Sequence, residues 1–284
     1  MSNVEVYRKL VNEELFKSAS FSDAWRIWHP VLEQKSNNFL SARSIYELGS
    51  QLSSVFSETS TEGRGQGVLS AAGNVWESLV CWYLNLIFSG TNAVAIKQKK
   101  KLIPECISDA ATIRYGTDET NTESDLIVIV FPKDFKFPDP FNISELSGLI
   151  STQLHLFELG VVQCKTNWND NAQIPMLWDM IYRAKGFSDH NISIGRNGHS
   201  ISDLKKFTYS FVTVPTQKKP YKSTDMAVKR VRNLSGGNYW GGPTKSGVAF
   251  CLNEIFSKNF SSAFDRPIIQ SVQNAVDCKL GLFE

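Results

Sequence analysis

The chain has 284 residues, of which 42% are hydrophobic and 12% aromatic, so it is long enough and apolar enough to bury a sizeable core. A net charge of +2 neither requires nor excludes a nucleic-acid partner. The sequence holds no apolar run of membrane-spanning length, and its charged start lacks the apolar segment of a signal peptide. Five scattered cysteines without CxxC spacing predict reduced thiols, and we therefore expect a cytoplasmic protein.

Hydrophobic residues recur at steps of three and four through the first 60 residues, which predicts helices. The expected helices cover 4–19, 21–34 and 42–58. A Gly- and Ser-rich stretch over 60–74 predicts a flexible loop. Asn74 is then the expected N-cap of a strongly apolar helix over 74–88.

Farther along the chain the pattern changes to β-branched runs and alternation, which predict strands. The expected strands lie within 92–105, 124–132, 156–168 and 205–216. Other segments predict a loop with a short helix over 133–153, a helix in the later part of 172–187, a mobile loop over 230–247 and a helix over 247–264. Strands that alternate with helices indicate an α/β fold with a mixed central sheet flanked by helices.

We find no linker, so we expect one domain over 1–284. A helical N-terminal region (1–65) precedes a core (70–215), and a C-terminal loop and helix (216–284) follow it. Two basic stretches, 97–101 and 217–234, flank an acidic one. That distribution suits a polyanion held around a metal site, and it equally fits solvated faces of a surface.

Polar side chains end the apolar run GVVQCK and begin the run SDLIVIV. Because side chains alternate along a strand, Gln163 and Lys165 share one face of the strand that contains GVVQCK. If the two strands pair antiparallel, the start of one lies beside the end of the other, which brings Asp125 close to both residues. A carboxylate, an amide oxygen and an ammonium group can together hold a Mg²⁺ ion and a nucleophilic water.

The segments ESDLIVIV and GVVQCK resemble the D…(D/E)xK signature of the PD-(D/E)xK nuclease superfamily, in the glutamine form of Mrr-type restriction nucleases. The helix AAGNVWESLVCWYL resembles the helix ahead of the catalytic strands in many type II restriction endonucleases. This resemblance implies a restriction-endonuclease-like fold, with a mixed sheet of four or five strands. It also implies that Asp125 is the central metal ligand and Lys165 the catalytic lysine. Gln163 then occupies the acidic position of the motif, and Glu77 is the helix glutamate.

The implied catalytic set is therefore Asp125, Gln163, Lys165 and Glu77, of which all but the lysine would bind Mg²⁺. Gln163 contributes no charge, so Glu77 or Glu123 would have to complete the metal site. Plainer roles also fit these residues. Asp125 can cap the start of a strand, Gln163 and Lys165 can be edge or surface residues, and Glu77 can be paired or face solvent.

Polar side chains directly behind the site, and basic ones farther along, are candidate DNA contacts. They are Asn167, Trp168, Asn169, Asn171 and Gln173, followed by Arg230, Arg232 and Lys245. The first group also fits a polar loop with a helix cap.

The resemblance implies a site-specific, Mg²⁺-dependent endonuclease of double-stranded DNA that leaves 5′-phosphate and 3′-hydroxyl ends, as type II restriction enzymes do. A homodimer is the expected assembly, since two-fold dimers suit palindromic targets, and a separate DNA methyltransferase would belong to the same system. Two other functions stay open: a repair or junction-resolving nuclease of the same fold, and a non-catalytic DNA-binding protein on a degenerate nuclease fold.

Overall fold

The N-terminal part of the chain is helical, as predicted. A computed structural model of the protein describes residues 3–58, 66–97, 101–120, 125–166, 192–214, 221–241, 251–280 and 282. The three helices expected in the first 60 residues are confirmed as α1 (Asn3–Phe16), α2 (Ala19–Lys35) and α3 (Ala42–Ser57). Their apolar faces pack together and against the long helix α4 (Gln66–Ile87).

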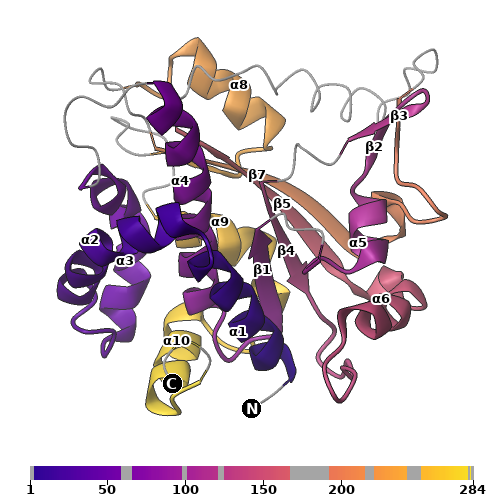
Figure 1. Cartoon of the computed structure of the whole chain (residues 1–284), viewed down its shortest axis with the longest axis horizontal. Coiled ribbons are helices and arrows are strands. Elements are labelled where there is room, and N and C mark those ends of the chain that lie inside the picture. The colour runs from indigo at the N-terminus through magenta and orange to yellow at the C-terminus, as the bar shows by residue number, and fades with distance from the viewer. Residues whose placement is uncertain are drawn as a thin grey trace.

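A five-stranded sheet forms the centre of the molecule (Figure 1). In spatial order its strands are β1 (Ala93–Lys97), β4 (Leu126–Val130), β5 (Glu158–Lys165), β7 (Lys206–Thr213) and β8 (Tyr239–Gly241). The β1–β4 and β4–β5 pairs are antiparallel, whereas the β5–β7 and β7–β8 pairs are parallel. The sheet is therefore mixed, and β5 is its middle strand.

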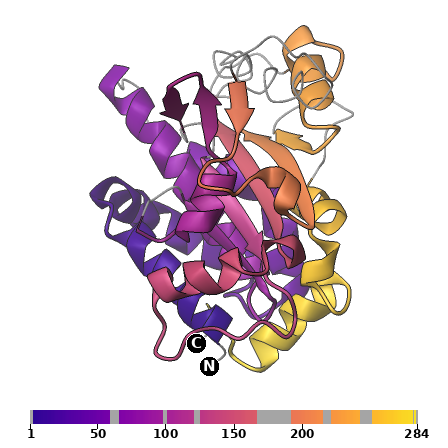
Figure 2. The same cartoon turned by 90° about the vertical axis from the view of Figure 1, so that its right-hand side faces the viewer.

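Helices cover both faces of this sheet, which confirms a mixed α/β fold. On one face lie α4 and the C-terminal helix α9 (Leu252–Asn259), whereas the last helix, α10 (Ile268–Asp277), packs against α3. On the other lie α5 (Glu105–Ala110) and α6 (Ile143–Ser151), on the side turned toward the viewer in Figure 2. Because both faces are covered, β4 is buried along its whole length, as its continuous β-branched sequence predicted.

A second, three-stranded sheet was not predicted. Its order is β3 (Asp118–Thr120), β2 (Ile113–Tyr115) and β6 (Ile192–Ile194), with three residues in each strand. The turn after β6 is fixed to α5 and β3 by Arg196, which donates to Asp109 at 2.6 Å and to Glu119 at 2.9 Å. Strands this short give almost no periodic signal, which explains why the sequence did not indicate them.

The predicted loop over 60–74 is wrong for its second half, because α4 begins at Gln66. Asn74 therefore lies inside the helix and is not its N-cap. Glycine in a helix costs about 1 kcal/mol relative to alanine, which favoured a loop on sequence alone. The buried face that follows, which includes Trp76 and Leu79, stabilises the helix through tertiary packing and outweighs that cost.

The predicted mobile loop over 230–247 is also wrong in its first part. Arg230 and Arg232 belong to a helix, α8 (Met226–Leu234), which buries Val228, Val231 and Leu234 against the sheet residues Phe211 and Tyr239. Apolar residues at steps of three were the signal for this helix. The tail helix is shorter than predicted, because α9 ends at Asn259, and α10 was missed altogether.

Gly160, in the middle of β5, lies under the ring of Phe260, and a Cβ atom there would overlap that ring. The ring is fully buried and stacks on Phe256, so it cannot move aside cheaply. We expect Gly160→Ala to lower the free energy of unfolding by about 1–3 kcal/mol, the usual cost of overpacking.

The matched control is Gly148→Ala in α6, where a Cβ atom meets nothing within 4 Å. That substitution should raise the free energy of unfolding by about 0.5–1 kcal/mol, because alanine is the better helix residue. Urea unfolding of both variants checks that the free energy of unfolding falls in Gly160→Ala and rises in Gly148→Ala. A neutral Gly160→Ala would mean that the sheet and α9 are not packed as described.

Candidate active site at the end of strand β5

Strands β4 and β5 bring Asp125 next to the end of β5, as the sequence predicted. Their register pairs Leu126 with Val162, so one further step places Asp125 opposite Gln163. The Cys164 backbone N–H donates to the Asp125 carboxylate at 2.7 Å. The antiparallel pairing assumed in the sequence analysis is thus confirmed, and the 131–157 excursion lies between the two strands.

This hydrogen bond also bears out the plainer role of Asp125. β4 begins at Leu126, so the Cys164 N–H lies past the backbone ladder of the two strands, and the Asp125 side chain supplies its acceptor. One carboxylate oxygen, Oδ2, therefore has a structural partner. A carboxylate has two oxygens and about four lone pairs, so this contact is compatible with binding a cation as well.

Gln163 is not an edge or surface residue, because it lies on the middle strand with 1% of its surface exposed. Its side-chain oxygen accepts a hydrogen bond from the Tyr209 hydroxyl on β7 at 2.6 Å. Lys165 is the last residue of β5 and is half-buried. Its backbone carbonyl accepts from Val214 N–H at 2.9 Å, which continues the pairing with β7.

Glu77 lies near the same end of the strands as Lys165, but over the other face of the sheet. Its carboxylate pairs with Lys97, the last residue of β1, at 3.1 Å, and less than a fifth of either side chain is exposed. Lys97 pairs in register with Leu126, which pairs with Val162, so Lys97 lies on the face that packs against α4. Side chains alternate, and the structure therefore does not bring Glu77 to the face that carries Gln163 and Lys165.

Lys97 is held by several oxygens of α4 besides Glu77. Its ammonium group donates to the Asn74 carbonyl at 2.7 Å and to the Ser78 hydroxyl at 3.2 Å. These contacts give Glu77 a paired, structural role, one of the readings that the sequence left open. Its assignment as a metal ligand stays a prediction.

The charges of the site converge on the Cys164 thiol, which is fully buried on the α4 face. Burial raises the pKa of this thiol well above its usual range, and the Asp125 and Glu77 carboxylates raise it further, while Lys165 acts in the opposite direction. The thiol therefore stays protonated at neutral pH. A protonated thiol is neither a good nucleophile nor a good metal ligand.

The donor set fits one hard divalent cation. Asp125 offers a charged oxygen and Gln163 a neutral one, and Mg²⁺ binds through one or two carboxylates while it retains several waters. Within the described ranges no group of three or more His, Cys, Asp and Glu side chains is arranged as a metal cage. A site of this kind suits Mg²⁺ better than Zn²⁺, which usually takes three or four nitrogen or sulfur ligands.

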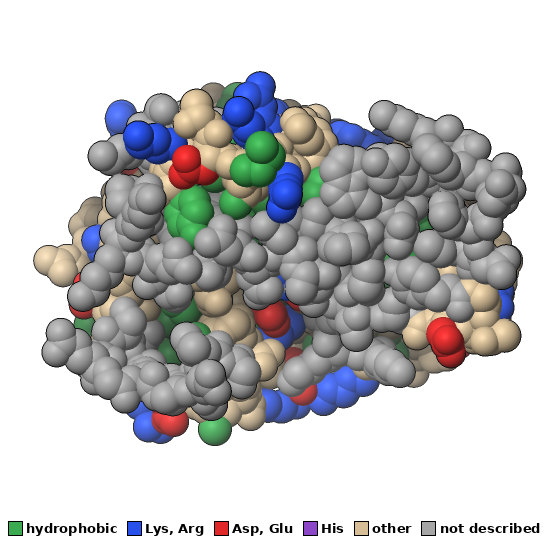
Figure 3. All heavy atoms as spheres, turned by 90° about the horizontal axis from the view of Figure 1, so that it is seen from above, with side chains coloured by type: hydrophobic (Ala, Val, Ile, Leu, Met, Phe, Trp, Pro, Cys, Tyr) green, Lys and Arg blue, Asp and Glu red, His purple; other side chains and the backbone are tan. Residues whose placement is uncertain are grey.

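The predicted DNA contacts are only partly described. Arg230 and Arg232 are exposed on α8, together with Lys229, and α8 packs over the face of β7 that carries Phe211. Figure 3 looks onto this end of the molecule and shows Lys and Arg side chains gathered over α8 at its upper margin, with acidic and basic side chains near its centre. Six other predicted contacts lie outside the described residues, namely Asn167, Trp168, Asn169, Asn171, Gln173 and Lys245. Glu123, the alternative metal ligand, also lies outside them.

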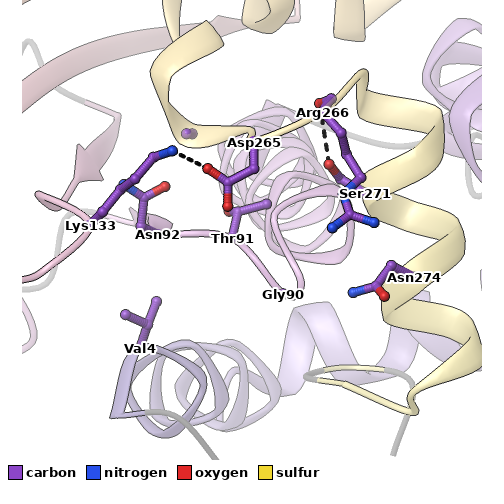
Figure 4. Close-up of a pocket in the computed structure, with 10 residues that line it drawn as sticks. Val4, Gly90, Thr91, Asn92, Lys133, Asp265, Arg266, Ser271 and Asn274 are labelled. Carbon is purple, nitrogen blue, oxygen red and sulfur yellow. Dashed lines mark hydrogen bonds and ion pairs between the residues drawn. The ribbon is translucent and has the colours of Figure 1, made fainter.

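A pocket of about 250 Å³ lies at the opposite end of the sheet, before β1 and after β4 (Figure 4). Asn92 lines it, and Lys133 pairs there with Asp265. It is smaller than the pockets of about 300–1,000 Å³ that usually hold small ligands. Asp265 in its lining is already paired with Lys133, so we do not place the chemistry there.

Comparison with known proteins adds no assignment: neither the protein-family models nor the curated proteins that we searched contain a match to this chain. In the part of the chain that the structure describes, no helix has both the length and the apolar character needed to cross a bilayer.

The sequence did not predict two side chains that contact the candidate residues, namely Tyr209, which contacts Gln163, and Lys97, which contacts Glu77. Tyr209 stands in the alternating run KFTYSF, on the same face of the expected strand as Phe207 and Phe211. A tyrosine between two phenylalanines on one face is typical of a core residue. Lys97 begins the basic run KQKKK and was grouped with its solvated neighbours. Only the pairing of β7 with β5, and of α4 with β1, reveals what these side chains contact.

Proposed function

We propose that this protein is a Mg²⁺-dependent endonuclease that cleaves double-stranded DNA at specific sites, with the restriction-endonuclease-like fold that its motifs resemble. The observation that carries the proposal is the meeting of Asp125 with Gln163 and Lys165 at one end of the middle strand. A carboxylate, an amide and an ammonium group carried by neighbouring antiparallel strand ends are the groups that a D…QxK site would need. The mixed five-stranded sheet supports the same reading.

In this proposal Asp125 and Gln163 would hold Mg²⁺, and Lys165 would act on the attacking water or the phosphate. When bound, the metal would lower the pKa of a coordinated water and neutralise charge on the phosphate. Lys165 supplies a positive charge where negative charge develops during the reaction. The water oxygen bonds to phosphorus as the P–O3′ bond breaks, and the leaving oxygen takes up a proton. The products are a 5′-phosphate and a 3′-hydroxyl.

The exposed arginines of α8 support a duplex as the substrate, because phosphate contacts from Arg and Lys supply most of the affinity for DNA. We further propose that two copies act as a homodimer on a palindromic target, in the cytoplasm, beside a separate methyltransferase that protects the host DNA. No stable complex with that methyltransferase is implied.

One observation favours a second candidate, a non-catalytic DNA-binding protein. Gln163 is neutral, and the helix carboxylate Glu77 is engaged by Lys97, so the described residues of this end give Asp125 no second carboxylate on its own face. A protein of this kind would bind DNA equally well with and without Mg²⁺.

Incubation with plasmid and phage DNA separates the two candidates. Wild-type protein, with Mg²⁺ or with EDTA, is compared with Lys165→Ala and with a control, Lys205→Ala. Lys205 pairs with Glu158 at the other end of β5, so its loss removes one lysine without touching the site. We expect discrete fragments that require Mg²⁺, persist in Lys205→Ala and vanish in Lys165→Ala.

Intact DNA with folded wild-type protein and Mg²⁺ would contradict the nuclease proposal for these substrates. Binding of the same DNA that does not change with EDTA would then favour the non-catalytic candidate. Cleavage that survives in Lys165→Ala would show that the catalytic lysine is misassigned.

A further inference from the structure

Helix α8 lies beside the proposed catalytic site, on the same face of the sheet. It packs over Phe211 of β7, which is in register with Gln163 of β5. Residues in register on neighbouring strands point to the same face, and such strands are only about 4.8 Å apart. Phe211 is also close to the end of β7, where Thr213 is in register with Lys165. A duplex bound over the end of β5 would therefore extend over α8.

The two faces of α8 differ in character. Its apolar residues Val228, Val231 and Leu234 are buried against the sheet. The opposite face carries five exposed side chains, which are Met226, Lys229, Arg230, Arg232 and Asn233. Among the residues that the structure describes, none forms an ion pair with the three basic side chains of this face. Their charges are therefore available to a polyanion, and Figure 3 shows the basic side chains gathered over α8.

Helix geometry divides this exposed face into a centre and two margins. Because successive residues are about 100° apart, Lys229 and Asn233 flank the line directly opposite the buried face. Arg230 and Arg232 lie about 80° from that line, on opposite sides of it. A helix in a groove of DNA turns its centre to the base edges and its margins to the two backbones. Arginines suit the margins, because guanidinium groups bind phosphates well.

The central side chains have the chemistry that reads bases. An asparagine amide donates and accepts at once, which matches N6 and N7 of adenine, and a lysine donates to O6 and N7 of guanine. The major groove is about 12 Å wide and admits an α-helix. An anionic membrane fits this face less well. Helices on membrane surfaces insert their apolar face, whereas that of α8 is already buried against the sheet.

We propose that α8 enters the major groove of the bound duplex, where Lys229 and Asn233 contact base edges and Arg230 and Arg232 contact the phosphates on either side. This inference rests on the DNA-binding part of the proposed function and names the element that supplies its sequence specificity. The two arginines were already candidate contacts in the sequence, whereas Lys229 and Asn233 were not.

The salt dependence of binding tests the phosphate contacts. The affinity for a mixed-sequence duplex is measured by fluorescence anisotropy over a range of NaCl concentrations, with EDTA or with Ca²⁺ in place of Mg²⁺. We expect Arg230→Ala and Arg232→Ala each to reduce the slope of log affinity against log salt concentration by about 1. Lys258→Ala is the matched control, because it removes the same charge from an exposed position of α9, on the other face of the sheet. It should leave the slope unchanged.

Selection from a duplex library with a randomised centre tests the base contacts. The duplexes that remain bound are sequenced for wild type, Lys229→Ala and Asn233→Ala. We expect wild type to enrich one sequence, and each variant to lose the preference at one base pair of it by about tenfold or more. Gln34→Ala, at an exposed position of α2, should enrich the same sequence as wild type.

Thermal unfolding checks that all variants are folded. Slopes equal to wild type in both arginine variants, or a wild-type preference that survives in both Lys229→Ala and Asn233→Ala, would overturn the inference. So would wild-type binding without any preference. In each of these cases cleavage by wild type with Mg²⁺ would leave the nuclease proposal intact. Wild-type protein that neither binds nor cuts a duplex would overturn both, and binding to anionic lipid vesicles instead would assign the basic face to a membrane.

Discussion

Asp125→Ala is expected to lose Mn²⁺ binding and to slow DNA cleavage by at least ~10³-fold, because a metal ion contributes several kcal/mol of transition-state stabilisation and each 1.4 kcal/mol is about a factor of ten in rate. In the proposed site Asp125 supplies the negative charge, because Gln163 is neutral and the Glu77 carboxylate is paired with Lys97.

The same substitution should also destabilise the fold, for a separate reason. The Cys164 N–H donates to Asp125 at 2.7 Å, and alanine leaves this partly buried donor without its acceptor. An unsatisfied buried donor costs about 1–3 kcal/mol. Asp125→Asn keeps an oxygen at this position but not the charge.

The two variants together therefore separate the chemical role of Asp125 from its structural role. Asp125→Asn should unfold close to wild type in urea yet cleave as poorly as Asp125→Ala. Asp125→Ala alone should shift the unfolding midpoint. If Asp125→Asn keeps full cleavage, the carboxylate is not a metal ligand, and its role is only that of a strand cap.

Glu5→Ala should lower the free energy of unfolding by about 3–5 kcal/mol, because it leaves a buried charge without its partner. Glu5 pairs with Arg8, and both side chains are almost completely buried. Burial lowers the pKa of Arg8 and the Glu5 carboxylate raises it, so the carboxylate is what keeps the guanidinium charge tolerable in this place.

This pair also joins α1 to the segment between α4 and β1. Arg8 donates to the Ala93 carbonyl at 2.6 Å and to the Thr91 carbonyl at 3.1 Å, and Glu5 accepts from Gly90 N–H at 2.7 Å. Removal of Glu5 therefore also orphans a backbone donor. Neither the sequence nor the helix periodicity indicated these contacts.

The chain contains a matched control for the ion pair. Asp23 and Arg26 have the same spacing, on α2, but their side chains are 70% and 80% exposed. Asp23→Ala should change the free energy of unfolding by less than about 1 kcal/mol, as is usual for exposed pairs. Similar losses from Asp23→Ala and Glu5→Ala in urea unfolding would show that burial is not what makes the first pair important.

The sequence indicated the pairing of β4 with β5, and hence the meeting of their ends, more completely than the short elements around them. Asp125 and Gln163 could be predicted to lie close together, because both strands have clear apolar runs and an antiparallel pair brings the start of one beside the end of the other. This holds for any loop that joins them. The sequence predicted a loop for Arg230 and Arg232, although they belong to α8. The helix has only three buried apolar residues, and the glycines that follow it in the chain indicated a loop more strongly. The short strands β2, β3 and β6 fell below the length at which a pattern is informative.

The contacts of Gln163 and Glu77 could not be predicted, because each depends on the register of two elements far apart in the chain. The parallel pairing that sets Tyr209 beside Gln163 leaves no trace in either strand alone. Lys97 reaches Glu77 only because α4 packs over β1. Resemblance to restriction enzymes implies that Glu77 is a metal ligand, which stays a prediction, and the structure adds that its carboxylate pairs with Lys97.

The position of β5 as the middle strand links assembly of the proposed site to the completion of folding. Asp125 meets Cys164 across 39 residues of chain, and Tyr209 meets Gln163 across another 46. Contacts between such distant segments form late, because closing long loops costs entropy before any contact compensates. A chain still emerging from the ribosome therefore has the residues of the site but not the site. An enzyme that cuts DNA would become active only as a finished molecule, a form of protection for the cell that makes it.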